Sequence, residues 1–325
     1  MLSVVLITRN HPEYVKRILE SPCSLNQHCD YLILDSSNDD CSREIESLAA
    51  GSVWAYEHLD TKLTTDEKIL NLLGNFKGNY LWMIGDGVIP DLESLWPWLS
   101  QRLEEHPDCI HLVNRDARNC RHFFTENGLA EEFMTDDIVT ACSDFFWSAT
   151  FLGALIISRN LAGQMLACER LNSYLNTGFA VPCLVFDSLE ANHGKMLISL
   201  RHYYLPNPKK QLSVWIREGR VFEIWSKDFP EAIQALPEAF DLVKEEIIRT
   251  VCRRNEYYSL RYMFRWRGMG ILNKDSLAEH REELLFMSRL SPHTLDNLSK
   301  MPKWLCRFGY MPFELRNQFK HARYR

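Results

Sequence analysis

Asp86 lies between two glycines, at the point where a run of apolar residues ends. The run covers residues 80–84 and is too short for a lone helix, so the pattern predicts a strand buried on both faces. A carboxylate just past such a strand lies at the carboxyl edge of a parallel sheet, where open α/β sheets bind their ligands. We therefore expect Asp86 to contact a metal ion, a nucleotide ligand or both.

Polar residues also follow the two other strands predicted near the amino terminus. Thr8, Arg9 and Asn10 end the first apolar run, and Asp35 opens a polar loop at 35–40. Because neighbouring parallel strands end at the same edge of a sheet, these groups are expected to converge on one cleft. Each group alone is better explained as a turn or a helix cap. The three strand ends together favour a nucleotide-type cleft.

The elements that must position these residues alternate between strand and helix over residues 1–90. This alternation indicates a doubly wound, mostly parallel α/β sheet. The expected strands are 2–8, 31–34, 53–56, 81–84, 109–113, 150–158 and 196–200. The expected helices are 13–20, 43–50, 65–76, 91–105 with Asp91 as its cap, and most of 170–193. Residues 115–145 are polar and are expected to form a flap or an acceptor loop.

Composition is that of an ordinary globular protein. The 325 residues are 46% hydrophobic, which argues against disorder, and no apolar run reaches the roughly 18 residues that span a bilayer. The amino terminus lacks the basic leader of a secretory signal. None of the ten cysteines forms a Cys-x-x-Cys pair, so we expect neither a zinc site nor a disulfide framework, and we expect a cytoplasmic protein.

Charge is distributed unevenly along the chain. Residues 247–325 contain 16 Lys and Arg against 7 Asp and Glu, a net charge of +9, whereas the whole chain carries −6 and the rest therefore −15. The basic residues of this tail alternate with aromatic ones, as at 261–267 and 303–310, which suits an anionic membrane surface. A helical subdomain that packs its aromatic residues internally explains the pattern equally well. No nucleic-acid partner is expected, because the body of the chain is acidic.

Four segments resemble motifs of family 2 glycosyltransferases, which have the GT-A fold. Residues 3–12 resemble the opening strand and turn, and the loop 35–40, Asp-Ser-Ser-Asn-Asp-Asp, resembles the Asp-Asp-Gly-Ser-x-Asp loop. Residues 78–86 resemble the Gly-Glu-Tyr strand that leads into the Asp-x-Asp motif, and 152–159 resemble the Gly-x-x-x-x-x-Arg strand. A Tyr-x-Trp strand followed by Gly-Asp is similar to the abequosyltransferase-like branch. The resemblance covers residues 1–205 and implies a Rossmann-like GT-A catalytic domain.

The resemblance implies transfer of a sugar from a nucleoside-diphosphate donor to a saccharide hydroxyl. On this resemblance, Thr8 and Asn10 border the base and ribose, and Asp35 hydrogen-bonds the nucleobase. Asp66 and Lys68 match positions near the donor, where a lysine can also neutralise a diphosphate. Lys68 is explained at least as well as a solvated lysine on a helix surface.

The largest departure from the family pattern is at the metal motif. The Asp-x-Asp positions are occupied by Asp86, Gly87 and Val88, so one of the two carboxylates is absent. A Mg²⁺ or Mn²⁺ ion takes few protein ligands when phosphates and water supply the rest, so Asp86 alone can suffice. The alternatives are a site in which Lys68 or Arg9 neutralises the diphosphate, and a catalytically inactive relative.

An inverting transfer requires a general base for the acceptor hydroxyl. Members of the family carry this carboxylate on a helix before a glycine-led strand. Asp187 is the nearest match, although it lies closer to Gly194 than is usual. Asp144 is the competing candidate, and each of the two is also explained as an ordinary exposed acid.

Together these patterns predict a cytoplasmic glycosyltransferase, peripheral at the inner face of the plasma membrane, that acts on a lipid-linked intermediate of a surface polysaccharide. Residues 1–205 would form the catalytic domain and residues 206–325 a basic, aromatic-rich helical domain, with a linker at 206–210. A non-catalytic nucleotide-sugar-binding partner is the first alternative, because one motif acid is absent. A nucleotidyltransferase is the second and weaker one, because residues 6–10 contain no glycine.

Overall fold

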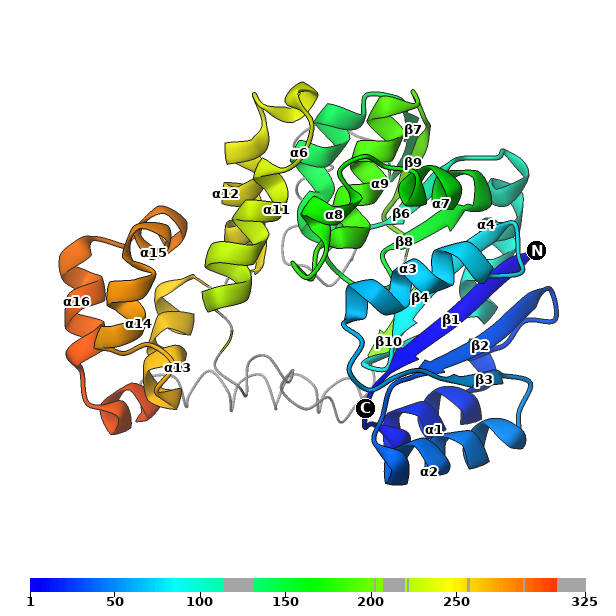
Figure 1. Ribbon diagram of the computed structural model, residues 1–325, viewed down its shortest axis with the longest axis horizontal. Helices are drawn as coiled ribbons and strands as arrows, with labels where there is room; N and C mark the ends of the chain where they lie inside the picture. The colour runs from blue at the N-terminus through cyan, green and yellow to red at the C-terminus, as the bar shows by residue number, and fades with distance from the viewer. Residues whose placement is uncertain are drawn as a thin grey trace. The chain divides into compact units, whose positions relative to one another are not determined.

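The computed structural model describes most of the chain (Figure 1). It describes residues 1–113, 131–201, 203–206, 220, 222–255, 258–288 and 290–308, without the side chains of 23, 206 and 253–255. The predicted flap, the linker at 206–210 and the motif at 303–310 each extend outside these residues. The chain divides into two compact units, Met1–Gln211 with Ala232–Lys244, and Leu212–Glu231 with Glu245–Arg325. The boundary at 205/206 stays a prediction.

An eight-stranded sheet forms the centre of the first unit, in the order β3-β2-β1-β4-β8-β6-β9-β7. Its strands are β1 (Leu2–Thr8), β2 (Cys29–Asp35), β3 (Ala55–His58), β4 (Tyr80–Gly85), β6 (Cys109–Leu112), β7 (Glu132–Thr135), β8 (Leu155–Ser158) and β9 (Met196–Ser199). The four strands from β3 to β4 are parallel, and so are β6 and β9, whereas β8 and β7 run antiparallel to their neighbours. The prediction of a mostly parallel sheet is confirmed.

Helices cover both faces of this sheet (Figure 1). One layer contains α1 (Pro12–Glu20), α2 (Asp39–Ala50) and α4 (Leu92–Glu104), and the other contains α3 (Thr65–Asn75), α6 (Ile138–Ala149), α7 (Arg159–Leu166), α8 (Leu171–Tyr174) and α9 (Ala180–Ala191). The first layer packs on the sheet through a cluster that includes Leu6, Val15 and Trp82. Because strand side chains alternate between faces, burial of every residue of β1 requires this cover on both sides.

Local signals set the starts of the helices that flank the carboxyl edge. Asn38 caps α2 by accepting a hydrogen bond from the amide of Cys41. Thr64 and Glu67 form a capping box at the start of α3. Asp91 caps α4, which confirms the predicted cap.

Several element predictions were wrong in extent. The described part of the loop expected at 115–145 forms β7 and most of α6, and the helix expected at 43–50 begins at Asp39. The strand expected at 150–158 begins only at Leu155, because α6 continues to Ala149 and a turn follows it. The helix expected over 170–193 is two helices, α8 and α9, because Asn176 and Gly178 between them have φ of 64° and 77°. The third strand begins at Ala55 rather than at residue 53, whose side chain is 66% exposed.

Two residues of the resembling motifs fix the amino end of β4. A Cβ atom on Gly78 would lie 2.8 Å from the Met1 carbonyl oxygen and from the Ser3 amide nitrogen, so only glycine fits there. Arg159 donates from Nε to the Gly78 carbonyl at 3.0 Å, and its guanidinium lies 4.4 Å from the centroid of the Phe76 ring. At the other end of β4, β5 (Val88–Pro90) pairs antiparallel with β10 (Tyr204–Pro206).

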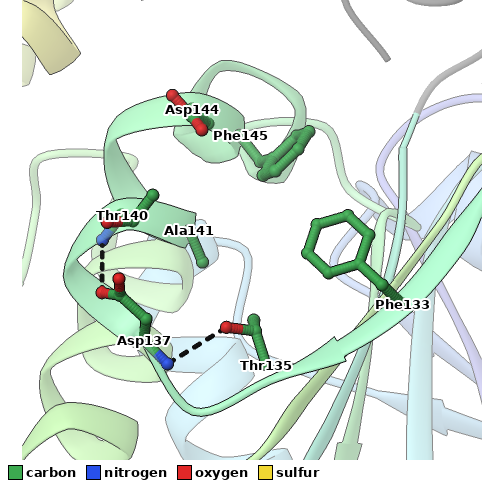
Figure 2. Close-up of a pocket in the computed structure, with 7 residues that line it drawn as sticks. All are labelled: Phe133, Thr135, Asp137, Thr140, Ala141, Asp144 and Phe145. Carbon is green, nitrogen blue, oxygen red and sulfur yellow. Dashed lines mark hydrogen bonds between the residues drawn. The ribbon is translucent and has the colours of Figure 1, made fainter. Parts of the chain in front are cut away.

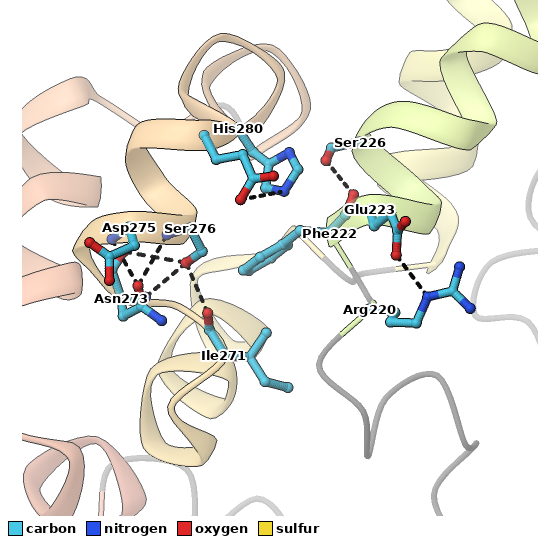
Figure 3. Close-up of polar contacts among 10 residues, drawn as sticks. Arg220, Phe222, Glu223, Ser226, Ile271, Asn273, Asp275, Ser276 and His280 are labelled. Atoms are coloured by element: carbon cyan, nitrogen blue, oxygen red, sulfur yellow. Dashed lines mark hydrogen bonds and ion pairs between the residues drawn. The ribbon is translucent and has the colours of Figure 1, made fainter.

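The C-terminal part of the chain is helical, as predicted. Its elements are a π-helix η2 (Glu223–Asp228), α11 (Phe229–Gln234), η3 (Glu238–Phe240), α12 (Lys244–Asn255), α13 (Leu260–Met269), α14 (Lys274–Glu279), α15 (Arg281–Ser288) and α16 (Pro292–Lys300). Figure 3 shows Asn273 and Ser276 forming a capping box at the start of α14, with Ser276 Oγ donating to the Ile271 carbonyl at 2.8 Å. The second unit has its own core, which includes Met263, Trp266, Leu277, Leu284, Leu295 and Leu298.

Candidate functional site

The carboxyl ends of β1, β2 and β4 lie side by side in the first unit. Thr8 pairs with Asp35 across β1 and β2, and Ile7 pairs with Gly85 across β1 and β4. Asp86 therefore follows β4 at the edge where β1 and β2 also end. This is the edge at which open α/β sheets bind ligands.

Asp86 contacts two side chains from the loop that follows β1. Its Oδ2 atom accepts a hydrogen bond from Thr8 Oγ1 at 2.8 Å and lies 2.8 Å from His11 Nδ1. The side chains of His11 and Asp86 are 23% and 19% exposed, so solvent reaches both groups. In the sequence, His11 stands out only as part of the segment 3–12, which resembles an opening strand and turn. The sequence feature that points to His11 is its position directly after the polar residues 8–10, which end the first strand.

The loops after β1 and β2 are joined through Asn10. Its backbone amide donates to Ser37 Oγ at 2.7 Å, and its side-chain oxygen accepts from the Asn38 amide at 2.9 Å. Asn10 has a φ of 59°, a left-handed conformation that asparagine tolerates better than most residues. These bonds make the two strand ends one connected rim.

Asp35 is fully buried beneath this rim. Its Oδ1 accepts from the Ser37 amide at 2.9 Å and also from the Ser37 hydroxyl, and its Oδ2 accepts from the Tyr56 hydroxyl at 3.1 Å. Both carboxylate oxygens are therefore hydrogen-bonded within the protein. The observed bonds make Asp35 an anchor of the loop, and its predicted contact with a nucleobase stays a prediction.

Two cations lie close to this loop. Lys68, on α3, is only 3% exposed, and its Nζ donates a hydrogen bond to Ser36 Oγ. Burial and, to a smaller extent, the nearby charge of Arg9 lower the pKa of Lys68 below its ordinary value. Arg9 itself is exposed. The observed burial excludes the interpretation of Lys68 as a solvated surface lysine.

Asp66 is directed away from the strand ends, toward the loop between α8 and α9. It is 4% exposed, and its Oδ2 accepts a hydrogen bond from the Gly178 amide at 3.1 Å. Burial raises the pKa of Asp66, and amide hydrogen bonds from Gly178 and Asn176 partly oppose this. Because Asn176 and Gly178 both have positive φ, this carboxylate holds a turn that carries the chain into α9.

We expect Asp66→Asn to remove a pH dependence of stability. Because the folded-state pKa of Asp66 is raised above 3.8, the folded chain binds this proton more tightly than the unfolded chain does. The free energy of unfolding of the natural chain should therefore fall as pH rises from 3.8 through the raised value. Asparagine keeps an oxygen for Gly178 but does not ionise, so the variant should gain stability relative to the natural chain over that window. Urea unfolding at a series of pH values measures this, with the exposed Asp39→Asn as control. A difference in the free energy of unfolding between Asp66→Asn and the natural chain that stays constant with pH would contradict this prediction.

Asp187, the first general-base candidate, lies in a buried polar cluster. It is 1% exposed on α9 and accepts from the Tyr174 hydroxyl at 2.7 Å. Cys168 Sγ lies 3.3 Å and Arg170 Nη1 lies 3.4 Å from its carboxylate. Its contacts are with α8 and the segment before it, and they do not include the residues at the strand ends.

Asp144, the second candidate, lies on α6 and lines a small cavity beside β7 (Figure 2). Figure 2 shows the Phe133 and Phe145 rings on one side of this cavity, and the hydrogen bond from the Thr140 amide to Asp137 on the other. Asp144 is half-buried. β7 is the outermost strand, and β4, β8, β6 and β9 lie between it and β1. At about 4.8 Å per strand, β1 and β7 are roughly 24 Å apart.

The strand ends offer a small set of donors for a metal ion. No group of three His, Cys, Asp or Glu side chains able to hold a metal occurs within the part of the chain that the structure describes. Asp86 and His11 do lie together, with a hydroxyl from Thr8 beside them. Because Mg²⁺ and Mn²⁺ in phosphate sites take few ligands from protein, this set fits an ion that a diphosphate also binds.

Sheet order, helix layers and the position of the polar edge together define the GT-A fold of nucleotide-sugar glycosyltransferases. TarS from S. aureus, as the structure of its residues 1–349, matches with a TM-score of 0.52 at 12% identity, over 92% of this chain and 90% of that one. The complex of the same fragment with UDP-GlcNAc matches with a TM-score of 0.51 at 13% identity, over 97% of this chain and 91% of that one.

A second protein with this fold is the mannosyltransferase PcManGT from Pyrobaculum calidifontis, in complex with GDP-Man and Mn²⁺. It matches with a TM-score of 0.50 at 11% identity, over 88% of this chain and 85% of that one. No family model and no curated protein matches the sequence. At these identities, the likeness establishes the fold.

Proposed function

We propose that the chain is a glycosyltransferase that moves a sugar from a nucleoside-diphosphate donor to a saccharide hydroxyl with inversion. The observation that carries this proposal is the partly exposed Asp86 carboxylate at the carboxyl edge of parallel strands in a GT-A fold. The buried Lys68 and exposed Arg9 supply positive charge for a diphosphate. The Tyr-x-Trp strand followed by Gly-Asp, at residues 80–86, supports a relationship to the abequosyltransferase-like branch.

In this proposal the connected rim binds the donor nucleotide. Thr8 and Asn10 border the base and ribose, and Asp35 holds the loop against which the base lies. Asp86 holds a divalent ion, Mn²⁺ or Mg²⁺, that the diphosphate also binds, and such an ion would offset the charge that develops on the leaving group. Lys68 approaches the same charge from α3.

A carboxylate outside the rim takes the proton from the acceptor hydroxyl. Asp144 is half-buried at a cavity, whereas Asp187 is 1% exposed and bonded to Tyr174, so Asp144 is the more accessible of the two carboxylates. The comparison of Asp144→Asn with Asp187→Asn decides between them. Only loss of the general base should lower the maximal rate without weakening donor binding.

The catalytic domain in this proposal is residues 1–205, and the helical domain is 206–325. The acceptor is a lipid-linked glycan at the cytoplasmic face of the membrane, and the enzyme is peripheral to that membrane. Among the described residues, no helix combines the length and hydropathy needed to cross a bilayer. A surface at 303–308 supports peripheral contact: Trp304 and Phe308 are 63% and 62% exposed, with ring centroids 6.3 Å apart. Basic residues flank this pair, namely Lys300, Lys303 and Arg307.

Replacing both Trp304 and Phe308 with alanine should weaken binding to anionic vesicles by at least about tenfold. Aromatic side chains anchor at the headgroup level, and the neighbouring cations each add roughly 1 kcal/mol near an anionic surface. Co-sedimentation with phosphatidylserine vesicles measures the effect. Leu242→Ala is the matched control, because Leu242 is apolar and 98% exposed. Equal sedimentation of the double variant and the control would remove the membrane contact from the proposal.

A non-catalytic nucleotide-sugar-binding partner is the second candidate, favoured by the single acid at 86–88. A thermal-shift screen of nucleotide sugars, with and without Mn²⁺, tests the shared step of both candidates. A ligand present at 100 times its Kd stabilises the folded state by about 2.7 kcal/mol. One nucleotide sugar should raise the melting temperature, and more so with Mn²⁺. No shift with any UDP-, GDP-, CDP- or dTDP-sugar would contradict both candidates.

A further inference from the structure

His11 is held rigidly against Asp86 by the start of α1. The His11 carbonyl accepts hydrogen bonds from the amides of Tyr14 at 3.0 Å and Val15 at 3.2 Å. Pro12 occupies the first position of the helix, where its fixed φ suits the first turn. The imidazole also lies 5.1 Å from the Tyr14 ring, centroid to centroid. The backbone bonds fix the main chain of His11 at the start of α1, and the Tyr14 ring packs beside the imidazole.

The distance between the two side chains is that of neighbouring ligands on one ion. His11 Nδ1 and Asp86 Oδ2 are 2.8 Å apart. Adjacent ligands of an octahedral ion with bonds of 2.0–2.1 Å are separated by about 3 Å. The pair can therefore receive an ion with a shift of a few tenths of an ångström. Thr8 Oγ1, 2.8 Å from the same carboxylate oxygen, orients that carboxylate.

We propose that His11 Nδ1 is the second protein ligand, beside Asp86, of the divalent ion at the donor diphosphate. It thereby takes the place of the carboxylate that the Asp-x-Asp pattern would supply at position 88. This inference rests on the proposed function, since the diphosphate completes the coordination. An imidazole ligand favours transition-metal ions, whereas all-oxygen sites favour Mg²⁺. The site should therefore bind Mn²⁺ in preference to Mg²⁺.

Ligation requires Nδ1 to present its lone pair. A neutral imidazole carries one proton, which in the ligating tautomer is on Nε2, and the hydrogen bond between Nδ1 and Oδ2 is then replaced by two bonds to the ion. No group is oxidised or reduced in this exchange. The charges of Asp86 and of the diphosphate offset that of the ion.

The test compares His11→Asn with the natural chain. Asparagine can keep a hydrogen bond to Asp86 through its amide N–H, but it replaces the imidazole nitrogen with a neutral oxygen ligand that does not favour Mn²⁺ over Mg²⁺. Calorimetric titration with UDP and with GDP, each with Mn²⁺ or with Mg²⁺, gives the affinities, and electron paramagnetic resonance counts bound Mn²⁺. His28→Asn is the control, because His28 is an exposed histidine that precedes β2 at the opposite edge of the sheet.

We expect His11→Asn to weaken Mn²⁺-dependent diphosphate binding by at least about tenfold and to abolish the preference for Mn²⁺ over Mg²⁺. His28→Asn should behave as the natural chain. Unchanged Mn²⁺ binding in His11→Asn would overturn the inference and leave His11 as a hydrogen-bonding partner of Asp86 only. Failure of the natural chain to bind UDP or GDP with either ion would instead overturn the proposed function, so the two failures are distinguishable.

Discussion

Replacing Asp86 with alanine is expected to reduce donor turnover by more than about 100-fold. Asp86 supplies the carboxylate of the proposed metal site, and loss of metal-ion stabilisation removes several kcal/mol from the transition state, at about 1.4 kcal/mol for each factor of ten. Release of the nucleoside diphosphate from the donor measures the rate.

The fold should survive this substitution. Asp86 is 19% exposed and its partner His11 is 23% exposed, so water can replace the carboxylate at this rim. The free energy of unfolding should change by less than about 1 kcal/mol. Asp136→Ala, at an exposed acid before α6, is the control for turnover. Turnover in Asp86→Ala equal to that of the control would show that the carboxylate is not part of the catalytic site.

Replacing Asp35 with alanine is expected to lower the free energy of unfolding by about 3 kcal/mol, because a buried carboxylate with several donors is removed and those donors lose their partner. The donors are the amide and hydroxyl of Ser37 and the hydroxyl of Tyr56. Tyr56 keeps a contact with Ser42 Oγ at 2.8 Å, which limits the loss. Urea unfolding measures the change.

The matched control for Asp35 is Asp40→Ala, in the first turn of α2. The Asp40 side chain is 91% exposed and pairs with Arg43, so its removal should change stability by no more than about 0.5 kcal/mol. Asp35→Asn keeps one acceptor and should lie between the two. If Asp35→Ala and Asp40→Ala have the same free energy of unfolding, the Asp35 carboxylate does not anchor the loop.

The β-α alternation in the first half of the chain could be predicted because β1 and β4 are buried on both faces and are short apolar runs in the sequence. The apolar run at 80–84 predicted both the strand β4 and the position of Asp86 at the edge of the sheet. The register that places Thr8 opposite Asp35 follows from parallel pairing of such strands. Because a strand buried on both faces is a continuous apolar run, its end can be located from the sequence, and the predicted position of Asp86 matches the observed one.

The extents of later elements could not be predicted because apolar composition does not distinguish a buried helix from a buried strand. Residues 145–157 are largely apolar, yet they form the end of α6, a turn and most of β8. The turn between α8 and α9 is held by a hydrogen bond that the Gly178 amide donates to Asp66 Oδ2. The two residues are far apart in the sequence, so no local pattern predicts this bond.

The residues of the site could be predicted only in part, because some of their contacts join distant parts of the sequence. Strand-end patterns identified Thr8, Asn10 and Asp86, which the structure brings to one rim. His11 contacts Asp86 across 75 positions of sequence, and no spacing rule connects them. Asp187 matched a family pattern by its place before Gly194, but the helix phase turns its side chain into a buried cluster with Tyr174.

Identification of the bond that breaks in the donor tests the proposed function most directly. The nucleotide sugar that stabilises the chain most is incubated with the protein and Mn²⁺, and the nucleotide product is separated by chromatography. We expect nucleoside diphosphate as the product, released by the natural chain and not by Asp86→Ala. Nucleoside monophosphate or pyrophosphate as the product, or a bound donor that stays intact at every metal concentration, would contradict glycosyl transfer.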